Sequence, residues 1–273
     1  MLGTTIKPNF DGCVICNSED FESIKLFCES CENCVHIDCV GEKPGNLKHV
    51  IGEEENLEVT WTCRVCSIQN SLNKNVEKDG TQLPEIDFRP ECCVCKLQGS
   101  IMCPTTSFDH RVKRPSGPSF QVSPTITISE LLKKEFEYQK CLAREKLKSP
   151  EVTYTPTLVN WIHLSCAFWL PQITIERGKP IHYKPTAQQA SGTCQICHSS
   201  EGMMFQCCYD TKTFDDEWEP FVDFQKKNHS CGVMMHVECA RRADFQMTYS
   251  AAIEKYQVYC YEHGPYQTDL DRY

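Results

Sequence analysis

Pairs of cysteine and histidine residues at short, regular intervals constrain this chain more than any other feature. Between residues 13 and 66 the sequence spells Cys-x2-Cys, then Cys-x2-Cys-x4-His-x2-Cys, then Cys-x2-Cys. Two thiolates, or a thiolate and an imidazole, two residues apart can close one side of a tetrahedral Zn2+ site. Four such pairs predict two zinc sites, built from Cys13, Cys16, Cys28, Cys31, His36, Cys39, Cys63 and Cys66.

The overall composition favours metal binding over disulfide bonding. The chain has 273 residues, 21 cysteines and 9 histidines. No apolar run is long enough to span a membrane, and residues 1–10 lack the apolar centre of a signal peptide. We therefore expect a reducing compartment, in which cysteines bind metal. The odd number of cysteines and the histidines at ligand spacing agree with this interpretation.

Two further ligand sets follow the first. The second set uses a Cys-x2-Cys pair and a distant His-x2-Cys pair. Cys93 and Cys103 are alternative ligands in the first pair. The two-residue spacing favours Cys92 with Cys95. In the third set Cys208 is the alternative to Cys207, which follows an expected short strand. Every site then has four protein ligands, which is typical of closed structural zinc sites, so we expect five zinc ions and no catalytic residues. The added ligands are Cys92, Cys95, His163 and Cys166, then Cys194, Cys197, Cys207, Cys231, His236, Cys239, Cys260 and His263.

The order of the first eight ligands separates two cross-braced folds. A RING order would use Cys34, His36 and Cys39 and then need a cysteine where Glu42 stands. With His36 as the fifth ligand and Trp61 two residues before the seventh, the module resembles a PHD finger. The resemblance implies interleaved sites, one of Cys13, Cys16, His36 and Cys39 and one of Cys28, Cys31, Cys63 and Cys66. An alternative pair, Cys31 with Cys34, leaves Cys28 without a partner, so we interpret Cys34 as a small packed residue.

The three sets together resemble the PZP module of chromatin scaffold proteins, such as the bromodomain-and-PHD and Jade scaffolds of histone acetyltransferase complexes. The resemblance rests on residues 26–31, 35–41, 161–171 and 236–240. It implies a small zinc-stabilised α+β fold, in which a zinc knuckle of three cysteines and one histidine joins two cross-braced PHD-type fingers with short strands. The expected order is a PHD finger at 10–70, a linker at 71–89, the knuckle at 90–172, a linker at 173–190 and an extended PHD finger at 191–266.

Large insertions distinguish the chain from most such modules and suggest a divergent fungal member, for which chromatin scaffolds with BAH, SANT and PHD domains are candidates. One insertion covers about residues 104–158, and a second covers residues 209–228. Residues 104–126 are rich in Pro, Ser, Thr and basic residues and predict a flexible loop. Thr127 to Glu130 forms a capping-box pattern, which predicts a helix over about 128–148. Leu132, Phe136, Ala143 and Leu147 share one side of this helix, which either packs on the zinc core or faces a partner.

By the same resemblance, we expect a chromatin reader whose first finger binds the N-terminal tail of histone H3. The tail would add an antiparallel strand to residues 23–27, and the carbonyls of Pro44 and Gly45 would hold its free amine. The net charge of residues 1–70 is −7, from 5 basic and 12 acidic residues, which favours a basic partner; the alternative is that these acids only solvate a surface. The expected histone-contacting residues are Glu19, Asp20, Glu22, Ile24, Leu26 and Glu29.

The aromatic residues near this strand predict which form of the tail is bound. A trimethylated lysine needs an aromatic cage. Phe27 directly precedes a ligand, so we expect both it and Trp61 in the core, which leaves Phe21 alone. One aromatic ring does not make a cage, and carboxylates favour an ammonium that still has its hydrogen-bond donors. We therefore expect a preference for the unmodified lysine at the fourth position of the tail.

The remaining expectations concern partners and location. They are a nuclear protein, contact with the nucleosome, and membership of a histone acetyltransferase complex or of a deacetylase or demethylase complex, with no membrane association. The net charge of −9 argues against general nucleic-acid binding. A weak DNA contact would need Arg241 and Arg242, or Arg111, Lys113 and Arg114. A RING-like zinc module of an E3 ubiquitin ligase is the alternative function.

Overall fold

A computed structural model shows a small, zinc-stabilised α+β protein with short strands and few helices. It describes residues 12–16, 24–41, 48–51, 57–74, 80, 84, 86–108, 126–148, 157–169, 173, 181–182, 192–209, 231–250 and 255–264. The chain divides into two compact units, one of residues 9–186 and one that contains residues 187–273. No helix in the described part of the chain is both long enough and apolar enough to cross a membrane.

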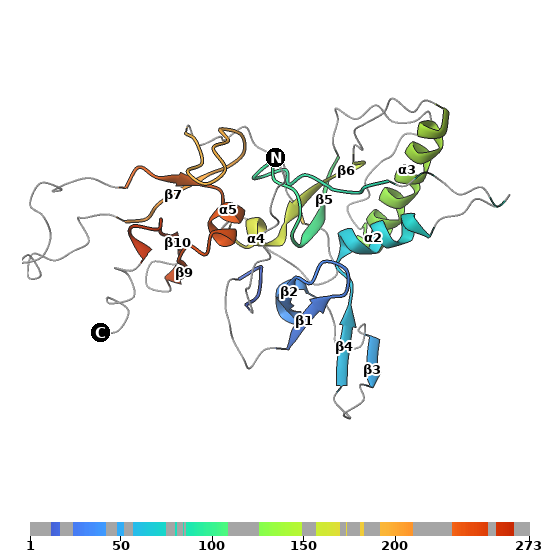
Figure 1. The fold of residues 1–273 in the computed structure, drawn as a ribbon, viewed down its shortest axis with the longest axis horizontal. Helices are drawn as coiled ribbons and strands as arrows, with labels where there is room; N and C mark the ends of the chain where they lie inside the picture. Colours follow the sequence, from blue (N-terminus) through green and yellow to red (C-terminus); the bar gives the residue numbers. More distant parts are fainter. Residues whose placement is uncertain are drawn as a thin grey trace, which may run out of the picture. The chain divides into compact units, whose positions relative to one another are not determined.

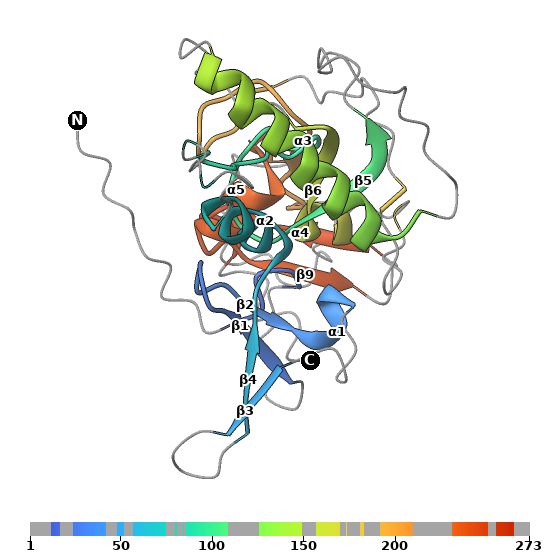
Figure 2. The same cartoon turned by 90° about the vertical axis from the view of Figure 1, so that its right-hand side faces the viewer.

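The first finger is built on a four-stranded sheet of order β2-β1-β4-β3. Strand β1 (Lys25–Cys28) pairs antiparallel with β2 (Cys34–His36), which leads into helix α1 (Ile37–Val40). Strands β3 (Lys48–Ile51) and β4 (Leu57–Trp61) form an antiparallel hairpin. The C-terminal end of β4 pairs in parallel with β1, and the rest of the hairpin projects away from β1 and β2 (Figures 1 and 2).

Helix α2 (Arg64–Asn73) begins directly after the ligand Cys63 and ties the first finger to the chain that follows. The amide of Gln69 donates to the carbonyl of Ile86 at 2.7 Å, and its oxygen accepts from the amide of Phe88 at 2.6 Å. The Phe88 ring lies edge-on to Trp161, with ring centroids 5.6 Å apart. The end of the segment expected as a linker is therefore packed against the core of the knuckle.

The knuckle contains strand β5 (Met102–Phe108), which pairs antiparallel with β6 (Val159–His163) ahead of helix α4 (Leu164–Phe168). The expectation of a flexible loop from residue 104 onward is wrong for residues 104–108, because these residues complete β5. Pro104 lies opposite Trp161, and the register shifts between Pro104 and Phe108. An irregular edge strand accepts proline, which is why composition alone is misleading here. Residues 109–125 lie outside the described part.

Helix α3 (Ile128–Lys148) is the inserted helix. Its capping box is confirmed: the Thr127 amide donates to the Glu130 carboxylate at 2.8 Å, and the Glu130 amide donates to the Thr127 hydroxyl at 3.2 Å. The helix packs against α2 and β5 (Figures 1 and 2), which confirms that it packs on its own unit. Of the predicted core side, Ala143 is buried and Leu132 and Phe136 are only half-buried, whereas the Leu147 side chain lies outside the described part. The other residues buried on α3 are Ile128, Leu131, Glu135, Tyr138 and Gln139.

The second unit repeats the plan of the first finger with shorter strands. Strand β7 (Phe205–Gln206) pairs antiparallel with β8 (Met234–Met235), which leads into helix α5 (Val237–Arg242). Strands β9 (Met247–Ser250) and β10 (Lys255–Val258) form a hairpin. Its small core is apolar and includes Met204, Met235, Val237, Ala240 and Val258.

Candidate metal centres

The structure brings the twenty predicted ligands together in five groups. Within each group the potential ligand atoms lie within 4.8 Å of one another. Cys207, and not the exposed Cys208, joins the fifth group. Of the described cysteines, Cys34, Cys93, Cys103, Cys141 and Cys208 belong to no group. The groups are Cys13, Cys16, His36 and Cys39; Cys28, Cys31, Cys63 and Cys66; Cys92, Cys95, His163 and Cys166; Cys194, Cys197, His236 and Cys239; and Cys207, Cys231, Cys260 and His263.

The same backbone turn forms three of the Cys-x2-Cys pairs. The residue after the second cysteine has a positive φ, namely 59° at Glu32, 62° at Lys96 and 58° at His198. In each turn this residue's amide donates to the carbonyl of the first cysteine, at 2.8, 3.0 and 2.9 Å respectively. The turn points both thiols to one side, so the local sequence is enough to assemble half of a tetrahedral site.

The His-x2-Cys pairs also share one local structure. His36, His163 and His236 are each the extended N-cap residue of a short helix, α1, α4 or α5. The cysteine three residues later is then in the first helical turn. Residues three apart on a helix lie on one face, which brings the imidazole and the thiol together.

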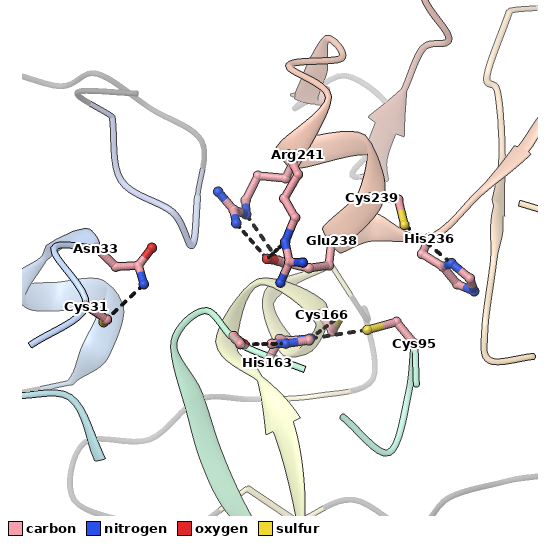
Figure 3. A network of polar contacts seen from close by, with 11 residues as sticks. Cys31, Asn33, Cys95, His163, Cys166, His236, Glu238, Cys239 and Arg241 are labelled. Atoms are coloured by element: carbon pink, nitrogen blue, oxygen red, sulfur yellow. Dashed lines mark hydrogen bonds and ion pairs between the residues drawn. The ribbon is translucent and has the colours of Figure 1, made fainter. Parts of the chain in front are cut away.

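Hydrogen bonds orient two of these imidazole rings. His163 Nδ1 lies 3.2 Å from Cys95 Sγ and 3.7 Å from Cys166 Sγ (Figure 3). Its Nε2 donates to the carbonyl of Gly99 at 2.8 Å, and Nε2 of His236 donates to that of Glu201 at the same distance. A proton held on Nε2 leaves the Nδ1 lone pair facing the thiols, as a metal ligand requires.

His263 is held by a different contact. Its Nδ1 lies 3.1 Å from Cys260 Sγ and 3.6 Å from Cys207 Sγ. The Tyr209 ring stacks on the imidazole, with centroids 3.9 Å apart and an interplanar angle of 6°. Sequence reasoning placed Tyr209 in an insertion and missed this role. Its position two residues after a ligand was the available signal.

Backbone amides and neighbouring thiols favour thiolates in these groups. The amides of His36, Cys63, His163 and Cys260 donate to the sulfur of the first cysteine of their groups at 3.3 to 3.4 Å. Hydrogen bonds from the Cys16 and Cys39 side chains lower the pKa of Cys13 to about 2, against the opposing effect of burial. The same sharing of protons raises the pKa of Cys39. A bound divalent cation would take the place of these shared protons and stabilise the crowded sulfurs.

The donor sets fit zinc well. Four groups combine three cysteines with one histidine, and the second group has four cysteines. Thiolates and imidazoles at this crowding suit tetrahedral Zn2+, and four protein ligands per ion match the closed pattern of structural sites. A bound zinc would cross-link segments that lie far apart in the sequence.

The predicted histone-contacting residues lie around β1 or outside the described part. Ile24 is 53% exposed, and the exposed Glu29 accepts from the Thr62 hydroxyl at 3.1 Å. Leu26 is fully buried, so only its backbone is available for pairing. Glu19, Asp20 and Glu22 lie outside the described residues, as do Phe21, Pro44 and Gly45.

The expectation that Phe27 belongs to the core is wrong. Its side chain is 55% exposed. Side chains alternate between the two faces of a strand. Because Leu26 and the ligand Cys28 both point inward, Phe27 must point outward. Trp61, expected in the core, is half-buried.

Two arginines named for a DNA contact surround a buried carboxylate in the second unit. Arg241 donates to Glu238 at 2.6 and 3.1 Å (Figure 3). Arg242 donates to the same carboxylate at 3.0 Å. Glu238 is fully buried and Arg241 is 7% exposed, so Arg241 cannot reach a phosphate backbone without breaking this pair. Arg111, Lys113 and Arg114 lie outside the described residues.

Curated proteins align with the chain across nearly its whole length. It is 23% identical to Protein Jade-1 of Xenopus laevis over 92% of its own residues, and 22% identical to E3 ubiquitin-protein ligase Jade-2 of Homo sapiens over the same share. It is 23% identical to Histone H3-lysine(4) N-trimethyltransferase ATX1 of Arabidopsis thaliana over 86% of its residues. The chain is a homologue of these proteins. It is a PHD-type zinc module that spans about a fifth of the length of the Jade proteins and 14% of ATX1. No protein-family model matches it.

Proposed function

We propose that this zinc module is a chromatin reader and scaffold that binds the N-terminal tail of histone H3, with its fourth residue preferred as unmodified lysine. The observation that carries the proposal is the outward side of β1. It presents the exposed Phe27, with the exposed Glu29 directly after the strand and the exposed Ile24 directly before it, and residues 1–70 have a net charge of −7. An extended basic tail can pair with such a strand and place its cations near carboxylates. The names of the relatives, which include a histone H3-lysine(4) methyltransferase, support this class of partner.

The sheet limits where the tail would lie. Strand β4 already pairs with β1 at Phe27 and Cys28, and the amide of Glu29 donates to the carbonyl of Trp61 at 3.0 Å. The β1–β4 register begins at Phe27, so an antiparallel tail would pair with residues 24–26. Its N-terminal end would then point toward the end of β4.

The lysine preference rests on the side chains near this strand. Among the described residues on the outward side of β1, Phe27 is the exposed aromatic ring. A single ring binds a trimethylammonium group weakly compared with a cage. The exposed carboxylate of Glu29 favours an ammonium that still has hydrogen-bond donors.

Titration of the zinc-loaded chain with H3 tail peptides tests the proposal. We expect binding of the unmodified peptide and weaker binding of the trimethylated one. Glu29→Gln and Phe27→Ser should each lower the affinity, whereas Glu32→Gln, at another exposed position of the same finger, should not. Tighter binding of the trimethylated peptide would refute the preference. No binding of either peptide would refute tail recognition itself.

The wider setting of the module follows from the same proposal. The chain would act in the nucleus, on the nucleosome, within a histone acetyltransferase complex or a deacetylase or demethylase complex. Co-purification of the tagged full-length protein from nuclei, followed by mass spectrometry of the bound subunits, tests this. Recovery without histone-modifying subunits would contradict it.

A second function, a zinc module of an E3 ubiquitin ligase, is favoured by one observation. A relative that aligns with 92% of the chain is named E3 ubiquitin-protein ligase Jade-2. Cross-braced zinc sites can present a docking surface for a ubiquitin-charged E2 enzyme. Ubiquitin discharge from a panel of E2 enzymes tests it; discharge that depends on Cys28 but not on Cys34 would support it.

A further inference from the structure

The sheet of the first finger has a second open edge, and it lies on the β3–β4 hairpin. One outer strand, β2, is covered, because the amide of Val14 donates to the carbonyl of Cys34 at 2.9 Å. Strand β1 pairs with β2 on one side, and the end of β4 covers part of its other side, at Phe27 and Cys28. The remaining outer strand is β3, and no residue in the described ranges pairs with its far side.

The register shows which backbone groups face outward on β3. The Trp61 carbonyl points to β1, since it accepts from the Glu29 amide. Backbone groups alternate sides along a strand, so Thr60 and Glu58 point their groups to β3. Lys48 lies opposite Thr60 and Val50 opposite Glu58. Lys48 and Val50 therefore form the hydrogen-bonded pairs of the hairpin, and His49 and Ile51 direct their N–H and C=O groups away from it.

Charge identifies the kind of strand that fits this edge. Residues 48–61 contain four glutamates and one lysine, and residues 1–70 together have a net charge of −7. A second copy of this chain carries a net charge of −9, so edge-to-edge pairing of two copies is opposed by repulsion. An extended lysine- and arginine-rich segment meets no such repulsion and pairs through its backbone.

We propose that the outer edge of β3 (Lys48–Ile51) docks an extended basic segment by strand addition. This edge is separate from the β1 site proposed for the histone tail. Backbone groups form the hydrogen bonds, and the net charge of the finger selects a basic partner. Docking on β3 therefore tolerates changes in the partner's sequence. The first finger can then hold two basic stretches, one on β1 and one on β3.

A pair of substitutions at one outward position separates backbone pairing from side-chain contact. His49→Pro removes the outward N–H and leaves the β3–β4 ladder intact, because edge strands accept proline. His49→Ala keeps the N–H. We expect His49→Pro to weaken binding about three- to tenfold, the usual net value of one hydrogen bond, and His49→Ala to leave it unchanged. Ile51→Pro, at the second outward position, should have the same effect as His49→Pro.

The probe is a scrambled, unmodified peptide with the amino-acid composition of the H3 tail, titrated into the full zinc-loaded chain by calorimetry. Zinc content and circular dichroism of each variant check the fold. Equal affinities of wild type and both proline variants, or no binding of the scrambled peptide, overturn the proposal. Concentration-dependent dimers that His49→Pro abolishes would also overturn it, in favour of a second copy. Binding of the authentic H3 peptide alone, unaffected by His49→Pro, supports the β1 site and refutes docking on β3.

Discussion

A buried carboxylate, Glu135, fastens the inserted helix α3 to the start of β6. Its Oε1 accepts from the Gln139 amide at 2.8 Å, and its two oxygens accept from the Leu158 amide at 3.1 and 3.0 Å. Oε2 also accepts from the Val159 amide at 3.1 Å. The side chain is fully buried. Glu135→Ala therefore leaves two buried backbone N–H groups without these acceptors.

The cost can be worked out from these contacts. Each orphaned buried donor costs about 1–3 kcal/mol, so Glu135→Ala should lower the free energy of unfolding by about 2–6 kcal/mol. Glu135→Gln keeps one acceptor oxygen but turns an amide N–H toward one backbone donor. This substitution should therefore lower the free energy of unfolding by about 1–3 kcal/mol. Glu137→Ala, at an exposed position of the same helix, is the control and should change stability little.

The same contacts predict a dependence on pH. Burial raises the pKa of Glu135 from 4.5 to about 7, against the opposing effect of its hydrogen bonds. A carboxyl whose pKa is raised by folding contributes fully below its unfolded pKa, and this contribution is lost as pH rises through about 7. The difference in stability between wild type and Glu135→Gln should therefore shrink by about 1 kcal/mol between about pH 6.5 and about pH 8.5.

Urea denaturation of the zinc-saturated chain, followed by tryptophan fluorescence, measures these free energies. Hydrogen exchange of the Leu158 and Val159 amides provides a local measurement, because both should lose protection in Glu135→Ala. A loss below about 1 kcal/mol in Glu135→Ala would refute the assignment of orphaned donors. A difference between wild type and Glu135→Gln that does not vary with pH would refute the raised pKa.

Three further predictions concern the metal groups and the buried ion pair. Cys28→Ser should unfold the first finger and lower bound zinc by one ion in native mass spectrometry, because structural zinc contributes about 10–16 kcal/mol of apparent binding free energy. Cys34→Ser should leave the metal content unchanged. An equal loss of zinc in both variants would contradict the grouping. Tyr209→Ala should speed zinc loss to a chelator, whereas Tyr209→Phe keeps the stacked ring and the wild-type rate; equal rates in the two variants would exclude stacking as the cause. Arg241→Ala should lower the free energy of unfolding by about 3 kcal/mol, because the buried carboxylate of Glu238 loses its bidentate partner. Arg242 is half-exposed, so Arg242→Ala should lower the free energy of unfolding by less than about 1 kcal/mol. Thermal denaturation that shows the larger loss for Arg242→Ala would refute this.

Features that depend on neighbouring residues were predictable from the sequence. The capping box at Thr127 and Glu130 is made within four residues, and the helix that it begins is present at residues 128–148. The exposure of Phe27 was also predictable from the sequence. Side chains alternate between the faces of a strand, so the inward ligand Cys28 determines the face on which each residue of β1 lies. The adjacency of Phe27 to a ligand led to the wrong expectation, because the neighbour of an inward residue in a strand points outward.

Features that depend on long-range pairing were not predictable. Residues 104–108 look like loop by composition, and they become strand because β6, more than fifty residues later, offers a partner. Glu135 looks like a surface residue of an amphipathic helix, yet its acceptors meet backbone donors 23 and 24 residues away. Local propensity contains no information about such partners.

The sequence by itself determined six of the half-sites of this protein. Three are tight turns that aim two thiols to one side, and three are helix starts that bring a histidine next to a cysteine, so local spacing specifies them. Only the tertiary structure decided which sides of the sheet remain open. Strand β4 closes part of β1 and leaves β3 as the outer strand because pairing between distant segments, and not residue type, determines where a sheet ends.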